Sequence, residues 1–299
     1  MKTVGFLGLG MMGRPMAINI AKGGFDTCVY DINPDVIAEC LDSGAKAAGG
    51  YGDIAKCDII CLCLPSSAIV EAALYGETGL LALMERGKIL IDFSTIFYET
   101  TVKINEEAVS RGIRFLDAPV SGMHSRAVDG SLTVMCGGDS LLFEEVKPLL
   151  ACVGSKILHM GKSGLGQLTK LINQLLFDIN AAALAEILPM AAKMGLDPDN
   201  VGEVVNSGTG RSYASEFFIP RILKNVFNEG YPMERAYKDL VSAAQLGAAK
   251  GIPLPILGTA TATYQQALLR GYGPLDKGAM IKVFEELHGL EFRSRAQKD

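Results

Sequence analysis

The chain has 299 residues, of which 49% are hydrophobic and 20% charged, so it can bury a large core, and its length favours two domains over one. Its net charge of −5, with no basic cluster, argues against nucleic acid as a main partner. No run of 18 uncharged apolar residues indicates a membrane span, and no signal-peptide pattern is present, so we expect a cytoplasmic protein that does not bind a membrane.

The first elements form a pattern typical of a dinucleotide-binding unit. A strand, a glycine-rich turn, a helix and a second strand are expected at residues 4–7, 8–13, 15–21 and 28–30. The turn holds Gly8, Gly10 and Gly13 in G-x-G-x-x-G spacing, and the second strand ends at Asp31. Because strand, turn, helix and terminal acid occur in order, the motif predicts dinucleotide binding.

Each residue of this turn has an expected role. Gly8 permits the tight turn, Gly10 lets a pyrophosphate approach the backbone, and Gly13 lets the helix pack closely on the strand. Met11 and Met12 lie between the last two glycines, and we count them among the cofactor-binding residues. The first-turn N–H groups and the helix dipole then face the phosphates.

Asp31 predicts which dinucleotide binds. It lies 18 residues after Gly13 (31 − 13), where a carboxylate can accept hydrogen bonds from a ribose 2′-hydroxyl. The same charge would repel a 2′-phosphate, so we expect NAD rather than NADP.

Strands and helices continue to alternate as far as residue 117, which predicts a parallel, doubly wound sheet. Strands are expected at residues 58–64, 88–93 and 114–117, and helices at 34–42, 68–84 and 98–111. Two further strands, at 131–136 and 156–159, flank a helix at 140–152. Ligands bind outside the carboxyl ends of such strands, which makes candidates of Leu64, Pro65, Ser94, Thr95 and the segment 118–122.

After the glycine-rich segment 161–166 the spacing of apolar residues becomes helical, and almost no stretch has the pattern of a β-strand. A helix is expected to about residue 194, and others near 199–206, 214–228, 232–250, 255–270 and 278–288. We therefore predict a Rossmann α/β domain over residues 1–163, followed by an all-helical domain over 164–299.

Lys170 is the candidate catalytic residue. It lies one turn into the long helix, and Asn173, Gln174 and Phe177 share its face. That face is offset from the apolar face, so we expect Lys170 to point away from the core of its own domain. From periodicity alone, an exposed lysine on an amphipathic helix is the simpler interpretation.

Four segments of the chain resemble the β-hydroxyacid dehydrogenase family, which includes 3-hydroxyisobutyrate dehydrogenase. In order they are GLGMMGRPMAINI at 8–20, DAPVSG at 117–122, GKSGLGQLTKLIN at 161–173 and YKDL at 237–240. The resemblance implies an NAD-dependent enzyme that interconverts a small β-hydroxyacid and its semialdehyde or keto form. It also implies a homodimer or homotetramer.

The resemblance assigns roles to particular residues. Lys170 would exchange the hydroxyl proton, and we expect burial to lower its pKa towards neutrality. Ser121 and Gly122 match the positions that hold the substrate carboxylate, and Lys238 matches a lysine that reaches back to the site. The segments at Leu64-Pro65 and Ser94-Thr95 match cofactor-contacting loops, and Lys238 is counted among the cofactor contacts as well.

The chain departs from the family pattern at two places. After Gly122, where the family commonly has glycine and a small residue, stand Met123 and His124. We expect these two residues in the substrate pocket, and we hypothesise that His124 or Arg126 meets a second anionic or polar group of the substrate. The family's amide partner of the lysine lies at i+4, which is Gln174 here, while Asn173 lies at i+3, so both remain candidates.

Other chemistries find little support in the sequence. No His- or acid-rich spacing predicts a metal site, and the seven cysteines are expected to be reduced and largely buried. Two rival interpretations keep the fold: an imine reductase, which generally lacks the lysine, and a non-catalytic nucleotide-binding protein. Retention of Lys170 argues against both.

Overall fold

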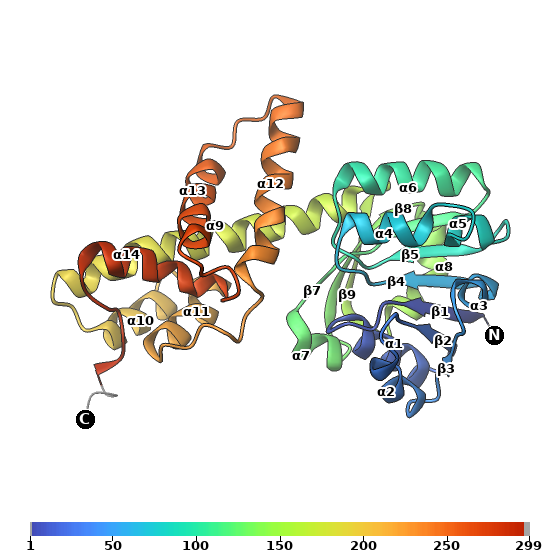
Figure 1. The fold of residues 1–299 in the computed structure, drawn as a ribbon, viewed down its shortest axis with the longest axis horizontal. Helices are drawn as coiled ribbons and strands as arrows, with labels where there is room; N and C mark the ends of the chain where they lie inside the picture. The colour runs from blue at the N-terminus through green and yellow to red at the C-terminus, as the bar shows by residue number, and fades with distance from the viewer. Residues whose placement is uncertain (1, 296–299) are drawn as a thin grey trace. The chain divides into compact units, whose positions relative to one another are not determined.

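The structure is a computed structural model that describes residues 2–295. The chain divides into two compact units, Met1–Lys170 and Leu171–Asp299, and each is described by itself (Figure 1).

The first unit is built on one nine-stranded sheet with the order β3-β2-β1-β4-β5-β6-β8-β7, in which β9 pairs with β8. The strands are β1 (Thr3–Leu7), β2 (Asp26–Tyr30), β3 (Lys46–Ala47), β4 (Ile59–Leu62), β5 (Ile89–Asp92), β6 (Arg114–Asp117), β7 (Val120–Ser121), β8 (Leu132–Gly138) and β9 (Gly154–Gly161). Strands β1 to β6 pair in parallel, which confirms the predicted doubly wound sheet. The chain then turns back, and β8 runs antiparallel to both β6 and β7.

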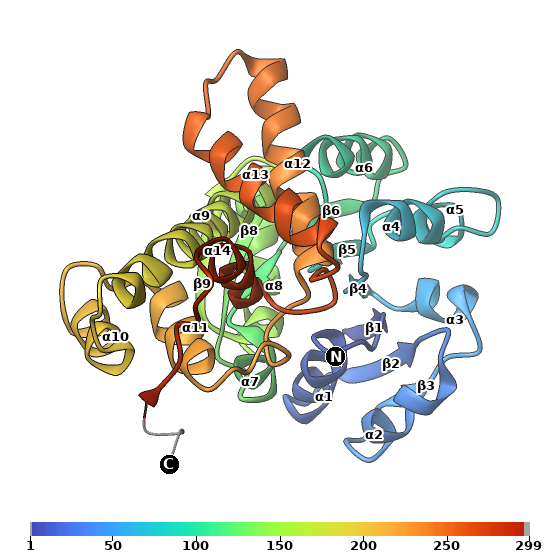
Figure 2. The same cartoon turned by 60° about the vertical axis from the view of Figure 1, so that its left-hand side comes forward.

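Helices cover both faces of this sheet. They are α1 (Gly13–Lys22), η1 (Pro34–Val36), α2 (Ala38–Leu41), α3 (Tyr51–Lys56), α4 (Ser67–Leu74), α5 (Leu80–Leu83), α6 (Tyr98–Ser110), α7 (Met123–Val128) and α8 (Ser140–Leu150). Alternate residues of β4 enter two separate cores: Ile59 and Cys61 pack with α1, α7 and α8, whereas Ile60 and Leu62 pack with α3 to α6. Figure 2 shows α4, α5 and α6 together on one side of β4 and β5.

Some expected elements are shorter or divided. The single helix expected at 68–84 is two helices, because Gly76 has φ +90° and a Cβ on Gly79 would lie 2.3 Å from the Tyr75 carbonyl oxygen. The helix expected at 34–42 is the short pair η1 and α2. The short elements β3, α3, β7 and α7 were not predicted, since each spans six residues or fewer.

The second unit consists of helices, as predicted. They are α9 (Leu165–Lys193), which begins in the first unit, then α10 (Pro198–Ser207), α11 (Tyr213–Leu223), α12 (Met233–Lys250), α13 (Pro255–Leu269), η2 (Lys277–Met280) and α14 (Ile281–His288). Helix α11 ends earlier than the expected residue 228, and Asn225 then adopts a left-handed conformation with φ +58°.

A search of residues 2–295 for helices that could cross a membrane finds α9, by its length and composition alone. Core helices of soluble proteins pass the same test. The face of α9 with Ala181, Ala185 and Leu188 lies in the core of the second unit, and the Asp178 carboxylate is fully buried in an ion pair with Lys277. We therefore interpret α9 as a core helix.

Candidate functional site

The glycine turn between β1 and α1 has the geometry of a dinucleotide-binding loop. Gly8 has φ +96°, and a Cβ there would lie 2.4 Å from the Cys63 carbonyl oxygen. A Cβ on Gly13 would lie 1.9 Å from the Gly8 carbonyl oxygen, so the fold itself requires both glycines. A Cβ on Gly10 would meet no heavy atom of the described chain within 4 Å. The space above Gly10 is what a pyrophosphate needs in order to approach the backbone.

Asp31 stands beside this turn, at the carboxyl end of β2. Its Oδ2 accepts a hydrogen bond from Leu9 N at 2.6 Å, and its Oδ1 accepts one from Asn33 N at 2.9 Å. The carboxylate is therefore held against the glycine turn, which fits a role with a ribose. The next residue, Ile32, is 89% exposed and carries no positive charge that could balance a 2′-phosphate.

The strand ends of β4 and β5 are joined by the Ser94 hydroxyl, which accepts a hydrogen bond from Leu64 N at 2.8 Å. Ser94 is buried, Thr95 and Leu64 are half-buried, and Pro65 is exposed. Within the glycine turn, Met11 is exposed and Met12 packs against the core. The predicted cofactor residues of the first unit therefore surround one edge of the sheet.

The segment after β6 turns sharply into α7. Ser121 ends β7, Gly122 has φ +146°, and Met123 has φ +63°. The left-handed conformation is unfavourable by on the order of 1 kcal/mol for a residue with a Cβ, so a glycine at position 123 would adopt it with less strain than Met123 does. Nδ1 of His124 donates to the Met11 carbonyl oxygen at 2.8 Å, which ties the predicted substrate segment to the glycine turn.

The first turn of α9 is anchored to the same edge of the sheet. Asp117, the last residue of β6, accepts hydrogen bonds from Gly164 N at 2.7 Å and Gln167 N at 3.0 Å. The side chain of Gln167 donates from Nε2 to Ser94 O at 2.6 Å and accepts from Ile96 N at 3.2 Å. These bonds lie within the first unit, so they fix the backbone one turn before Lys170 relative to the strand ends.

Lys170 itself is 8% exposed. The interpretation of an exposed surface lysine is therefore wrong. The amino end of α9 carries it to the carboxyl edge of the sheet, because each helical residue rises about 1.5 Å and Gln167 lies one turn earlier.

Sequence reasoning missed the two residues that hold this turn. Asp117 opens the DAPVSG segment, and Gln167 lies three residues before Lys170, so both stand inside the segments that carried the resemblance. Their position in those segments was the available signal.

The remaining predicted site residues belong to the second unit. The Gln174 Nε2 lies 3.4 Å from Oδ2 of the buried Asp239 on α12, whereas Asn173 is exposed. Lys238 precedes Asp239 and is half-buried. Gln174 is therefore the amide whose side chain contacts a buried carboxylate.

Two buried carboxylates lie side by side beneath the site, since Asp92 and Asp117 are register partners on β5 and β6. Burial, with a smaller contribution from the nearby Asp117 charge, raises the pKa of Asp92 to about 7, although hydrogen bonds from Ser94 oppose the shift. Burial also raises the pKa of Asp117, although the hydrogen bonds from Gly164 and Gln167 oppose the shift. Within residues 2–295, Oδ2 of Asp92 has no hydrogen-bond partner.

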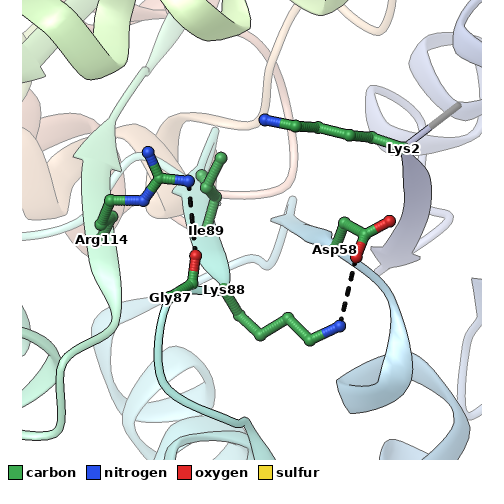
Figure 3. Close-up of a pocket in the computed structure, with 6 residues that line it drawn as sticks. All are labelled: Lys2, Asp58, Gly87, Lys88, Ile89 and Arg114. Carbon is green, nitrogen blue, oxygen red and sulfur yellow. Dashed lines mark hydrogen bonds and ion pairs between the residues drawn. The ribbon is translucent and has the colours of Figure 1, made fainter.

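A surface pocket of about 300 Å³ lies at the opposite edge of the sheet, where the parallel strands begin (Figure 3). Its charged side chains already have partners: Lys88 pairs with Asp58 at 3.3 Å, and Arg114 pairs with Glu145 at 2.5 Å. Because ligands of doubly wound sheets bind at the carboxyl ends, we do not assign this pocket to the reaction. Among the described residues, no group of three or more His, Cys, Asp or Glu is arranged to hold a metal.

Comparisons with known proteins cover both units. Residues 3–161 match the family described as the NAD binding domain of 6-phosphogluconate dehydrogenase, and residues 164–284 match the NAD-binding family of NADP-dependent 3-hydroxyisobutyrate dehydrogenase.

Individual relatives match nearly the whole chain. The chain is 36% identical to 2-(hydroxymethyl)glutarate dehydrogenase of Eubacterium barkeri, over 96% of each chain. It is 35% identical to 2-hydroxy-3-oxopropionate reductase of Escherichia coli, over 94% of this chain and 97% of that one. The crystal structure of 3-hydroxyisobutyrate dehydrogenase from Salmonella typhimurium superposes with a TM-score of 0.85 at 31% identity, over 95% and 100% of the two chains.

The glycine turn, the anchored lysine helix and these matches lead to one conclusion: the chain is an NAD(P)-linked oxidoreductase that belongs to the β-hydroxyacid dehydrogenase family.

Proposed function

We propose that the protein is an NAD-dependent enzyme that interconverts a small β-hydroxyacid and its semialdehyde or keto form, with Lys170 as the general acid and base. The observation that carries this proposal is the anchoring of α9. The Asp117 carboxylate accepts hydrogen bonds from its first turn, and the Gln167 side chain bonds to the loop after β5, so that turn is held at the carboxyl edge of the sheet. Lys170 follows one turn later and is buried. The relatives named above act on hydroxyacids or on a semialdehyde, which supports the substrate class.

The cofactor would lie on residues of the first unit. Gly10 leaves room for the pyrophosphate, the N–H groups at the start of α1 would donate to it, and Asp31 would accept from the ribose hydroxyls. The bound dinucleotide supplies a hydride acceptor in oxidation and a hydride donor in reduction. The carboxylate of Asp31, followed by the uncharged Ile32 and Asn33, favours NAD over NADP.

The substrate would be held by its carboxylate. The Ser121 hydroxyl and the backbone N–H of Gly122 could both donate hydrogen bonds to that carboxylate. Lys170 would accept the hydroxyl proton during oxidation, and its ammonium would return a proton to the carbonyl oxygen during reduction. Gln174 is the favoured amide partner of Lys170 because it lies at i+4, where the family has this amide, and Lys238 would contribute a second positive charge.

His124 and Arg126 remain the candidates for contact with a second polar group of the substrate. Each already has a backbone partner, since His124 donates to Met11 O and Arg126 donates to Ser131 O. A substrate group would therefore share or displace one of these bonds. The name of the Eubacterium barkeri relative refers to a glutarate, a dicarboxylate, which is the kind of substrate that such a contact would favour.

A panel assay tests the proposal. β-Hydroxyacids with NAD, and the corresponding semialdehydes with NADH or NADPH, are followed by the absorbance of the reduced nicotinamide. We expect turnover of at least one three- to six-carbon acid or semialdehyde, with NAD(H) preferred over NADP(H). Turnover of cyclic imines but of no hydroxyacid would favour the imine reductase instead, and NAD binding without any turnover would favour a non-catalytic protein.

Residue variants test the role of Lys170 in the same assay. The Lys170→Ala change should lower turnover by about 10²- to 10⁴-fold and leave NADH affinity nearly unchanged. The exposed Lys103 on α6 provides a matched control, because Lys103→Ala removes an amine outside the site.

The second unit supports the expected homo-oligomer. One stripe of α9 is exposed although it is apolar; it consists of Ile172, Leu176, Ala183, Ile187 and Met190, and Met194 extends it just after the helix ends. These residues are spaced by three, four or seven positions, so they share one face of the helix. We assign a second copy of the chain as the partner of this stripe, since exposed apolar surface of this extent marks an association site.

A further inference from the structure

We propose that Gln167 is a positioning residue for the reaction, which sets the register of the lysine helix against the loop that follows β5. This inference rests on the proposed role of Lys170 as acid and base. The Gln167 amide is clamped between Ser94 O and Ile96 N, and it thereby holds Lys170 at a fixed distance from the cofactor side of the sheet.

The clamp uses both ends of the amide. Nε2 donates to Ser94 O at 2.6 Å, while Oε1 accepts from Ile96 N at 3.2 Å. All three residues are buried, with Gln167 only 2% exposed. Without the amide, a buried carbonyl and a buried N–H would lose their hydrogen-bond partners, which is unfavourable away from water. Only a side chain that carries a donor and an acceptor at this length satisfies both groups.

A second anchor holds the same helical turn from the other side. Asp117 accepts from the backbone N–H groups of Gly164 and Gln167. The approach is close, because a Cβ on Gly137 or Gly166 would lie 2.6 Å from an oxygen of that carboxylate. The backbone of the turn is thus fixed to β6 through Asp117 and to the β5 loop through the Gln167 side chain.

The clamp joins the loop assigned to the cofactor to the helix that carries the proposed acid and base. The residue between the two bonded peptides is Thr95, in the loop assigned to the cofactor, and Lys170 lies one turn after Gln167 on α9. Misplacement of a reacting group by about 1 Å can cost a hundredfold in rate. A residue that fixes this separation therefore affects the chemical step more than binding.

The variant Gln167→Glu provides a test in which proton uptake restores the clamp. The ionised carboxylate still accepts from Ile96 N, but it cannot donate to Ser94 O. The protonated form has the shape of the amide and offers a donor and an acceptor again. We expect kcat to fall by about ten- to a hundredfold near pH 8, with NADH affinity changed by less than about threefold. The ratio of wild-type to variant kcat should then decrease as the pH is lowered towards about 5.

A second variant, Gln167→Met, has a similar length and no titratable group, so its kcat should be reduced at every pH without recovery. The matched control is Gln266→Glu, which introduces the same charge on an exposed face of α13 and should leave kcat unchanged. The midpoint of thermal unfolding is measured for each variant, so that a folding defect is recognised.

Three results would overturn the positioning role: wild-type kcat in both variants, equal loss of kcat and NADH affinity, or a Gln167→Glu deficit that does not change with pH. If Gln167→Met does not fold, the pH dependence of Gln167→Glu decides between these outcomes. If Gln167→Glu does not fold, the comparison of kcat with NADH affinity in Gln167→Met decides. Failure of the proposed function has a different signature, because Lys170→Ala would then retain turnover whatever the Gln167 variants do.

Discussion

At the glycine turn, a methyl group on Gly8 or Gly13 would overlap backbone atoms, whereas one on Gly10 would meet no heavy atom within 4 Å among residues 2–295. The three positions therefore differ in what they contribute. Two of them shape the protein, and the third leaves space for the ligand.

Two alanine variants separate these contributions. Gly13→Ala should destabilise the fold by about 1–3 kcal/mol, as overpacking does, and lower the midpoint of thermal unfolding. Gly10→Ala should keep the unfolding midpoint near that of the wild type and weaken NADH binding, measured by fluorescence titration. Equal effects of the two variants on stability would contradict the assignment.

Asp92 makes stability depend on pH. Its pKa is about 7 in the folded protein and 3.8 when unperturbed, because burial disfavours its charged form. Between these values the folded state binds more protons than the unfolded state, so this group lowers stability as the pH rises from about 4 to about 7. We expect Asp92→Asn to remove the decline, so the variant should gain stability over the wild type at about pH 8 and little at about pH 4 in urea unfolding.

At the scale of elements, α9 is tied to η2 by a buried ion pair. Lys277 is 2% exposed, bonds to the fully buried Asp178, and lies 4.5 Å above the Phe177 ring. Removal of one partner leaves an uncompensated buried charge, which typically costs about 3–5 kcal/mol.

Lys277→Met alone should therefore lower the free energy of unfolding by about 3–5 kcal/mol in a urea titration. The double variant Lys277→Met, Asp178→Leu should recover most of that loss, because no charge is then left buried. A single variant as stable as the wild type would show that the pair is not buried in solution.

Sequence patterns predicted the long elements well, because periodicity is legible over many residues. The expected helix to about residue 194 ends at Lys193. The strand expected at 114–117 matches β6 although it has only four residues, because it lies within the regular alternation of strands and helices. The short elements carried too few residues to show a period, and the antiparallel return of β8 depends on pairing rather than on local sequence. The sequence also singled out the glycine motif and Lys170, and their roles in binding and catalysis stay predictions. Gln167 was not singled out, because its partners lie 73 and 71 residues away.

At the scale of the whole molecule, the exposed apolar stripe of α9 predicts association with a second copy. Leu176→Glu combined with Ile187→Glu should place charges in that interface and lower the mass measured by light scattering towards that of one chain, 31.8 kDa. A paired control, Glu144→Gln with Lys147→Gln, alters an exposed ion pair on α8 and should leave the mass unchanged. A wild type that is monomeric at micromolar concentration would contradict the interface.

The central claim is that one buried amine on α9 exchanges the proton of the reaction. The most direct test is a single-turnover measurement of NADH oxidation by Lys170→Ala with the best semialdehyde from the panel, with and without added methylamine. We predict a rate of hydride transfer about 10²- to 10⁴-fold below the wild type, NADH affinity preserved, and partial recovery with methylamine. A rate within about threefold of the wild type, with no response to the amine, would contradict the account.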